Sequence, residues 1–329
     1  MSWINSVFVD ILNWINSWVG NYGWAVVVFT LFIKVLVLPL EIKSRKGMRA
    51  MNRIQPQLQA IQKKYANDKE KLNQKTMELY KKENVSMSAG CLPMLIQLPI
   101  LFIMFNAMRV VANEQTIQMI LSMKDGIMPE LQHWLWIKNV FQPDSFMSTI
   151  LPSVGAQLYE ITSVSYSSIL TAENIEAAKA FLASAEYAEI ATTYGASEFM
   201  RLQLNFGIAA PLLTLPKSFF ALMNYANGLF ILPVLAGLSQ FLMTKFTDGV
   251  QKKQKGELAQ QQPETNNAMN GTFMKWFFPL FSVWICASSN SAFSIYWMAS
   301  NVIAIVQQIV INRVLDREDA KRAAAAEKK

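Results

Sequence analysis

The apolar run over residues 22–40, YGWAVVVFTLFIKVLVLPL, constrains the fold more than any other stretch. As an α-helix it extends about 28 Å, enough to cross a hydrocarbon core of about 30 Å. It contains one charge, Lys34. An ammonium near the bilayer centre costs about 2.5–3.5 kcal/mol, so it usually faces protein or a water-filled cavity. The alternative is that Lys34, six residues before Leu40, extends its amine to the headgroups.

The rest of the chain continues this apolar character. Of its 329 residues, 52% are hydrophobic, which is too high and too unevenly spread for an ordinary soluble domain. The sequence predicts an all-α integral membrane protein with five transmembrane helices around a hydrophilic groove. The expected spans are residues 22–40, 87–108, 228–246, 273–289 and 292–314.

Basic residues predict the orientation, because cytoplasmic loops carry an excess of Lys and Arg. Twelve lie between residues 41 and 87, whereas the connection over residues 111–227 has 5 basic and 10 acidic residues. We therefore expect the N-terminus and the region 109–227 outside. The hairpin described below, the loop 247–272 and the tail 315–329 are expected in the cytoplasm.

Two further segments flank the first span. Residues 1–21 place tryptophans at helical spacing between polar residues, which favours an amphipathic helix lying in the outer interface. A signal peptide is the competing interpretation, but the positive start and the small-residue cleavage pattern are missing. Residues 41–86 predict a cytoplasmic helical hairpin that turns at Asn67 and Asp68. Its basic residues fit solubility and inner-leaflet affinity at least as well as nucleic-acid binding.

The external region carries an insertion over residues 153–227, which we expect to form a small, mostly helical subdomain. A helix is predicted over residues 171–193, with Thr171 and Asn174 as candidate caps. The motif HWLWIKNVFQPD, which precedes the insertion, is typical of an interfacial aromatic cluster. As an alternative, residues 206–223 could re-enter the membrane.

No chemistry-bearing constellation emerges from the sequence. Cys91 and Cys286 fall at opposite ends of their spans, so we expect small apolar fillers and not a disulfide. His133 has no second His or Cys nearby. With no nucleophile–base pair, metal cluster or phosphate loop visible, we predict no enzyme activity, no cofactor and no metal site.

Polar side chains recur at one depth of the predicted spans. Lys34 and Gln240 each lie six residues from the cytoplasmic end of their span, Gln307 lies six residues before Arg313, and Gln97 lies about 4 Å deeper. A single glutamine is often only a bond between helices. Several spans offering polar groups at similar depth predict a wet recess that opens toward the cytoplasm. The expected groove residues are Lys34, Gln97, Gln240, Trp297, Asn301 and Gln307.

These segments resemble the YidC family of membrane protein insertases in bacteria. The resemblance covers residues 30–105 (TLFIKVLVLPL through MLIQLPILFIMF), HWLWIKNVFQPD, ILPVLAGLSQFLMTK and MKWFFPLFSVWICASSNSAFSIYWMASNVIAIVQQIVI, in the family's order. It implies a five-helix core whose groove, open to cytoplasm and lipid, receives a polar segment of a nascent membrane protein. Lys34 stands where the family usually has Arg, and Gln240 and Trp297 match polar and aromatic groove positions.

The resemblance also implies partners and a location. These are nascent membrane proteins, membrane lipids, the ribosome, the signal recognition particle machinery and the Sec translocon, but no DNA, at the bacterial plasma membrane. The chain departs from the family in its short tail and in ValSerMetSer at residues 85–88, where AsnPro is common. Ribosome docking would then rely on the hairpin and on the loop 247–272.

Two other functions fit an apolar chain with an embedded charge. An ion or solute transporter would use Lys34 as its site, although inverted-repeat symmetry and ionisable pairs across spans are missing from the sequence. An assembly scaffold that does not insert proteins would form stable complexes of fixed stoichiometry.

Overall fold

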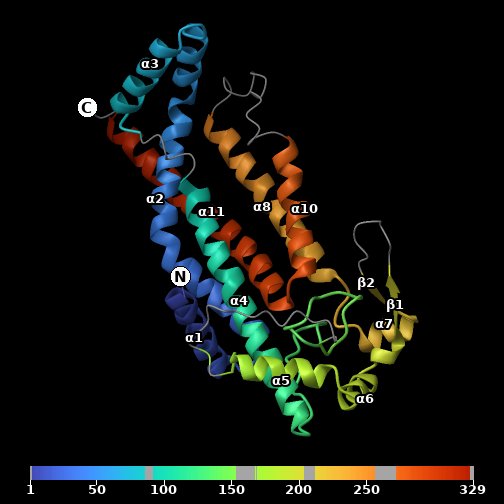
Figure 1. Ribbon diagram of the computed structural model, residues 1–329. Coiled ribbons are helices and arrows are strands. Elements are labelled where there is room, and N and C mark those ends of the chain that lie inside the picture. Colours follow the sequence, from blue (N-terminus) through green and yellow to red (C-terminus); the bar gives the residue numbers. More distant parts are fainter. Residues whose placement is uncertain are drawn as a thin grey trace. The chain divides into compact units, whose positions relative to one another are not determined.

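The structure is a computed structural model that describes residues 2–85, 92–152, 167, 169–203, 212–255 and 272–326, mostly as helix (Figure 1). The elements are α1 (Ser2–Val19), α2 (Tyr22–Lys64), α3 (Lys69–Lys82), α4 (Leu92–Lys124), α5 (Ala172–Leu182), α6 (Ala185–Thr193), η2 (Ala196–Glu198), β1 (Phe199–Gln203), β2 (Leu212–Pro216), α7 (Phe219–Tyr225), α8 (Ile231–Lys255), α10 (Thr272–Ser288) and α11 (Ser291–Ala326).

The chain divides into two compact units, and the long helices contribute to both. The first unit comprises Met1–Leu31, Phe102–Leu238 and Pro279–Ala299. The second comprises Phe32–Leu101, Ser239–Phe278 and Ser300–Lys329. The first therefore holds the predicted external region, and the second holds the predicted hairpin and most of the predicted polar recess.

A helix occupies most of each predicted span. Among the described residues, two stretches are long and apolar enough to cross a membrane, Tyr22–Lys64 and Ser291–Lys321. Helices α4, α8 and α10 cover the other three predicted spans, and their crossing stays a prediction. Helix α2 runs unbroken past residue 40 and includes Pro39 and Pro56. The predicted border between span and hairpin is therefore not a break in the helix.

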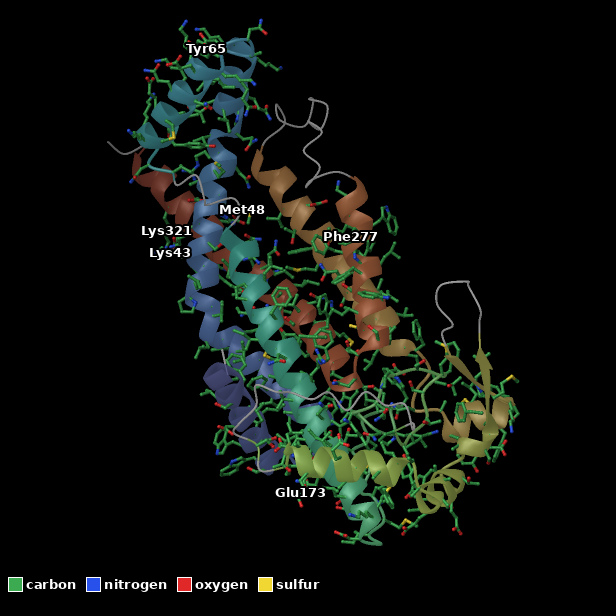
Figure 2. All side chains as sticks on the ribbon, in the orientation of Figure 1. Lys43, Met48, Tyr65, Glu173, Phe277 and Lys321 are labelled. Carbon is green, nitrogen blue, oxygen red and sulfur yellow. The ribbon has the colours of Figure 1, made fainter. Side chains whose placement is uncertain are left out.

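The hairpin is formed by the C-terminal half of α2 and by α3, with Tyr65 at its tip (Figure 2). Asp68 caps α3 by accepting a hydrogen bond from the backbone N–H of Lys71 at 3.0 Å, which holds the pKa of its carboxyl below the usual range. The two arms share a small buried core of Ile54, Leu58, Leu79 and Tyr80.

In the first unit, the buried carboxylate of Asp144 organises the loop that follows α4. It accepts hydrogen bonds from the backbone N–H groups of Phe230 and Leu232, at 3.1 and 2.6 Å, and from the indole of Trp136 at 3.2 Å. A carboxylate at a helix N-terminus satisfies free donors and complements the helix dipole. Asp144 therefore fixes the start of α8.

Part of the predicted aromatic cluster is buried within the protein. Trp134 is 4% exposed, and its ring centroid lies 5.5 Å from that of Trp24 on α2. A Cβ on Gly23 would lie only 2.3 Å from the Trp134 ring, so the absence of a side chain there permits this packing. The motif therefore supplies packing contacts, and its exposed large apolar side chain is Leu135, at 61%.

The all-α expectation is wrong for the insertion. Strands β1 and β2 pair antiparallel, in a register from Phe199 with Pro216 to Gln203 with Leu212. A short apolar run fits a strand or a helix equally well by periodicity, which is why residues 206–215 were open to a membrane interpretation. Residues 204–211 lie outside the described part, and residues 212–216 form a strand instead of a membrane helix.

The helix predicted over residues 171–193 is two helices. Thr171 caps α5 as expected and accepts from the backbone N–H of Asn174, so Asn174 is not the cap. Ser184 breaks the run because its side chain caps α6 by accepting from the N–H of Tyr187. One serine that bonds to the backbone is enough to end one helix and start the next.

The hairpin core gives a first prediction. Leu79→Ala should destabilise the hairpin by about 2 kcal/mol, the lower end for leucine truncation, because its core is small. Hydrogen–deuterium exchange of the full-length protein should then show faster exchange in both arms. Met77→Ala is the matched control, since Met77 is 43% exposed on the same helix. Equal acceleration by both variants would contradict the assignment of Leu79 to the core.

Candidate functional site

Lys34 is held inside the second unit by an ion pair within its own helix. Its Nζ lies 3.7 Å from Oε1 of Glu41, and the two side chains are 10% and 18% exposed. Residues seven apart share a helix face, and helical side chains lean toward the N-terminus, so Glu41 reaches back along α2 to Lys34. This burial favours the interpretation in which the amine faces protein.

Helix α11 contacts α2 beside the ion pair of Lys34 and Glu41. The side-chain Nε2 of Gln307 donates to the backbone carbonyl of Lys34 at 2.9 Å, so these two predicted groove residues lie together. The Oε1 atom of Gln307, the Oε2 atom of Glu41 and the hydroxyl of Ser44 are buried and have no hydrogen-bond partner among the described residues. Polar atoms with free bonding capacity therefore surround the ion pair.

One turn further along α2, a buried glutamine joins three helices. Gln308 is 1% exposed, and its Oε1 accepts from a guanidinium nitrogen of Arg45 at 3.3 Å and from the hydroxyl of Thr247 at 3.2 Å. Because the three residues belong to α11, α2 and α8, this acceptor ties together the helices that carry most of the predicted groove residues.

Arg49 fastens the base of the hairpin to the C-terminal part of α11. Its NH1 lies 2.8 Å from Asp316 and 3.3 Å from Asp319, while NH2 donates at 3.1 Å to both the backbone carbonyl and the side-chain oxygen of Asn312. The planar fork of arginine suits several acceptors at once. Nε of Arg49 and Nδ2 of Asn312 are buried and lack partners within the described chain.

The remaining predicted groove residues are distributed between the units. In the second unit, Asn301 donates to the hydroxyl of Ser239 at 3.1 Å, next to the half-buried Gln240. Trp297 belongs to the first unit, where it is 9% exposed and packs on Phe293 with 5.6 Å between ring centroids. The side chain of Gln97 lies outside the described residues.

Together, these contacts define a polar strip along α2 and α11, from Lys34 through Glu41 and Ser44 to Arg49. Five of its atoms, on Glu41, Ser44, Arg49, Gln307 and Asn312, are buried without a partner in the part of the chain that is described. Each such group costs about 1–3 kcal/mol unless water or a ligand satisfies it. The strip is therefore suited to holding water or the polar atoms of a polypeptide. Among the described residues, no group of His, Cys, Asp and Glu could hold a metal ion.

Sequence reasoning missed Glu41, Arg45 and Arg49 as members of this strip, because the membrane segment was ended at Leu40. The spacing along the helix indicated that these residues share a face with Lys34. Glu41 follows Lys34 by seven residues, and Arg45 and Arg49 follow at steps of four. A helix that continues past the lipid keeps the same face, so the polar face does not stop where the apolar run stops.

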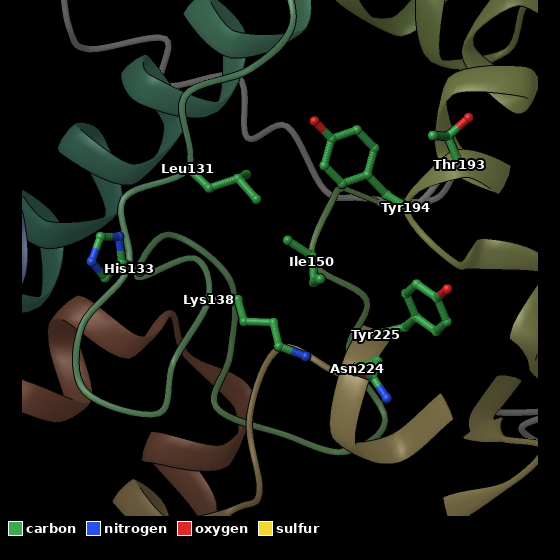
Figure 3. Close-up of a pocket in the computed structure, with 8 residues that line it drawn as sticks. All are labelled: Leu131, His133, Lys138, Ile150, Thr193, Tyr194, Asn224 and Tyr225. Carbon is green, nitrogen blue, oxygen red and sulfur yellow. The ribbon is translucent and has the colours of Figure 1, made fainter. Parts of the chain in front are cut away.

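A separate cavity of about 390 Å³ lies in the first unit and is lined by Leu131, His133, Lys138, Ile150, Thr193, Tyr194, Asn224 and Tyr225 (Figure 3). Lys138 donates to the backbone carbonyls of Met223 and Ala226, at 2.9 and 3.0 Å, at the end of α7. Partial burial lowers its pKa. An ammonium on the free carbonyls of a helix end stabilises the fold, so Lys138 serves the subdomain.

The arrangement defines a class, a helical membrane protein with a polar strip that begins at Lys34 inside an apolar helix, and comparison with known proteins gives the family. A family model described as "60Kd inner membrane protein" matches residues 14–190 and 196–319. The chain belongs to this family. With bacterial relatives, this membership places the protein in the bacterial plasma membrane.

The relatives are each named membrane protein insertase YidC. The one from Fusobacterium nucleatum is 41% identical over 136 residues, covering 41% of this chain and 58% of the relative. The one from Chlorobaculum parvum is 26% identical over 328 residues, covering 98% of this chain and 39% of the relative. The one from Oceanobacillus iheyensis is 45% identical over 112 residues, covering 31% of this chain and 44% of the relative. The chain thus spans less than two thirds of each.

The contacts of Arg49 give a second prediction. Arg49→Lys should lower the free energy of unfolding by about 1–3 kcal/mol, because lysine cannot bind Asn312 and the carboxylates together. The measurement is the Tm of the purified protein in detergent. Arg53→Lys is the control, since Arg53 is 71% exposed and 3.7 Å from Asp319, and should cost less than about 1 kcal/mol. An equal fall of Tm in both variants would contradict the role of Arg49 in joining the base of the hairpin to α11.

Proposed function

We propose that the protein is a membrane protein insertase that receives nascent membrane proteins in a hydrophilic groove and releases them laterally into the bilayer. The observation that carries the proposal is the buried ammonium of Lys34 on an apolar helix, bordered by polar atoms of Glu41, Ser44 and Gln307 that have no hydrogen-bond partner in the described part of the chain. The names of the relatives support the same activity.

The physical basis is a lower barrier for polar segments. Moving an unpaired polar group through hydrocarbon costs several kcal/mol, because nothing there satisfies its hydrogen bonds. A hydrated strip part-way into the bilayer shortens that path, and Lys34 attracts acidic residues of the substrate. The following apolar helix of the substrate then enters lipid by its own hydrophobicity, so this step consumes no ATP.

In the proposed arrangement, five helices cross the membrane, with the N-terminus outside and the C-terminus in the cytoplasm. Lys34, Gln240, Asn301 and Gln307 line the groove in the second unit, and Gln97 and Trp297 remain predicted groove residues. The hairpin, residues 41–86, meets incoming substrate or its targeting machinery. Ribosome, signal recognition particle and Sec translocon are proposed partners. The family and the relatives give no support to a transporter or a scaffold.

The charge of Lys34 gives a third prediction. In proteoliposomes, Lys34→Ala should reduce insertion of substrates with acidic translocated segments about tenfold, and Lys34→Arg should retain it, because Arg keeps the charge. Protease protection of the inserted segment is the measurement. Lys124→Ala is the control, because Lys124 is exposed at the end of α4 in the predicted external region, and it should leave insertion unchanged. Full activity of Lys34→Ala across several substrates would remove this charge from the mechanism.

Site-specific crosslinking tests the groove directly. A photoreactive residue at position 34 or 240 should crosslink a stalled nascent membrane protein, whereas one at position 173, an exposed site in the predicted external region, should not. Solute flux through the same proteoliposomes without a polypeptide substrate would instead favour a transporter. Stable complexes of fixed stoichiometry, without insertion by the purified protein, would favour a scaffold.

A further inference from the structure

The two oxygens of the Glu41 carboxylate have different surroundings. Oε1 lies 3.7 Å from the ammonium of Lys34, while Oε2 is buried and without a hydrogen-bond partner in the described residues. A full hydrogen bond between ammonium and carboxylate is about 2.7–2.9 Å long. Glu41 therefore neutralises Lys34 across a short gap without being tightly bonded to it.

This carboxylate has the same chemistry as an acidic side chain on an incoming polypeptide. Both present an anion to one ammonium. A neutral polar segment does not compete with Glu41 for Lys34. An acidic segment must compete with Glu41 for the ammonium of Lys34. The carboxylate of Glu41 therefore weakens the preference of the site for acidic segments.

A displaced Glu41 would have a second cation nearby. Arg45 follows it by four residues on the same face of α2, and the two charges interact. Within the described residues, Arg45 donates a hydrogen bond to Gln308, a neutral amide, and no ion pair of Arg45 is found there, so its positive charge can attract a neighbouring carboxylate. Glu41 can therefore release Lys34 without becoming an isolated charge.

We propose that Glu41 is an internal counter-ion that sets the selectivity of the groove between acidic and neutral segments. It neutralises Lys34 in the unloaded protein and yields the ammonium to a substrate carboxylate. This inference rests on the proposed insertase function and assigns Glu41 as a specificity-determining residue within it.

The test compares two reporter proteins that differ only by Asp or Asn in the translocated segment, inserted into proteoliposomes that contain the full-length protein. Glu41→Gln should raise the ratio of acidic to neutral insertion about fivefold over the unsubstituted protein, which corresponds to about 1 kcal/mol. Glu318→Gln is the matched control. It removes a carboxylate from an exposed pair with Lys46, at 3.2 Å, and should leave the ratio unchanged.

An unchanged ratio in Glu41→Gln, or an equal loss of both reporters, would overturn the counter-ion role. If Glu41→Gln does not fold, Glu41→Asp decides, because its shorter side chain reaches Lys34 less well and should also raise the ratio; an unchanged ratio overturns the role again. An unsubstituted protein that inserts neither reporter contradicts the insertase function itself. An active protein with an unchanged ratio contradicts only the role of Glu41.

Discussion

The ion pair between Lys34 and Glu41 is the interaction on which the second unit depends. An ammonium in a lipid-length helix is unfavourable unless protein or water surrounds it. Here the carboxylate two turns away supplies the opposite charge, and α11 covers the backbone of Lys34 through Gln307. The pair is largely buried yet loosely joined. The ammonium of Lys34 is therefore stabilised within the helix and can still attract the carboxylate of a third group.

The polar contacts continue from this pair along one face of α2. Gln308 receives hydrogen bonds from α2 and α8, and Arg49 binds the C-terminal part of α11 through Asn312, Asp316 and Asp319. The base of the hairpin is therefore fixed to α11 by directional bonds instead of apolar packing alone. Such bonds hold helices in register while leaving polar atoms available, which suits a site for a polypeptide of variable sequence.

Much of the architecture could be predicted because it depends on local patterns. Apolar runs of lipid length marked the helices, AsnAsp marked the turn of the hairpin, and Thr171 marked the start of α5. The pairing of β1 with β2 could not be predicted, because a short apolar run satisfies a strand or a helix alike until its partner is known. Ser184 was similarly ambiguous, since serine is tolerated within helices and also favoured at their starts.

By itself the sequence determined that a charge and several amides lie within apolar helices, because composition and helical period are local properties of the chain. Tertiary structure alone decided what those groups meet: Lys34 is paired with Glu41, Gln307 lies against the backbone of Lys34, and Arg49 faces α11. The physical reason is that the orientation and burial of a polar side chain depend on the neighbouring helix, and residues on α2 and α11 that touch are separated by more than 260 positions in the chain.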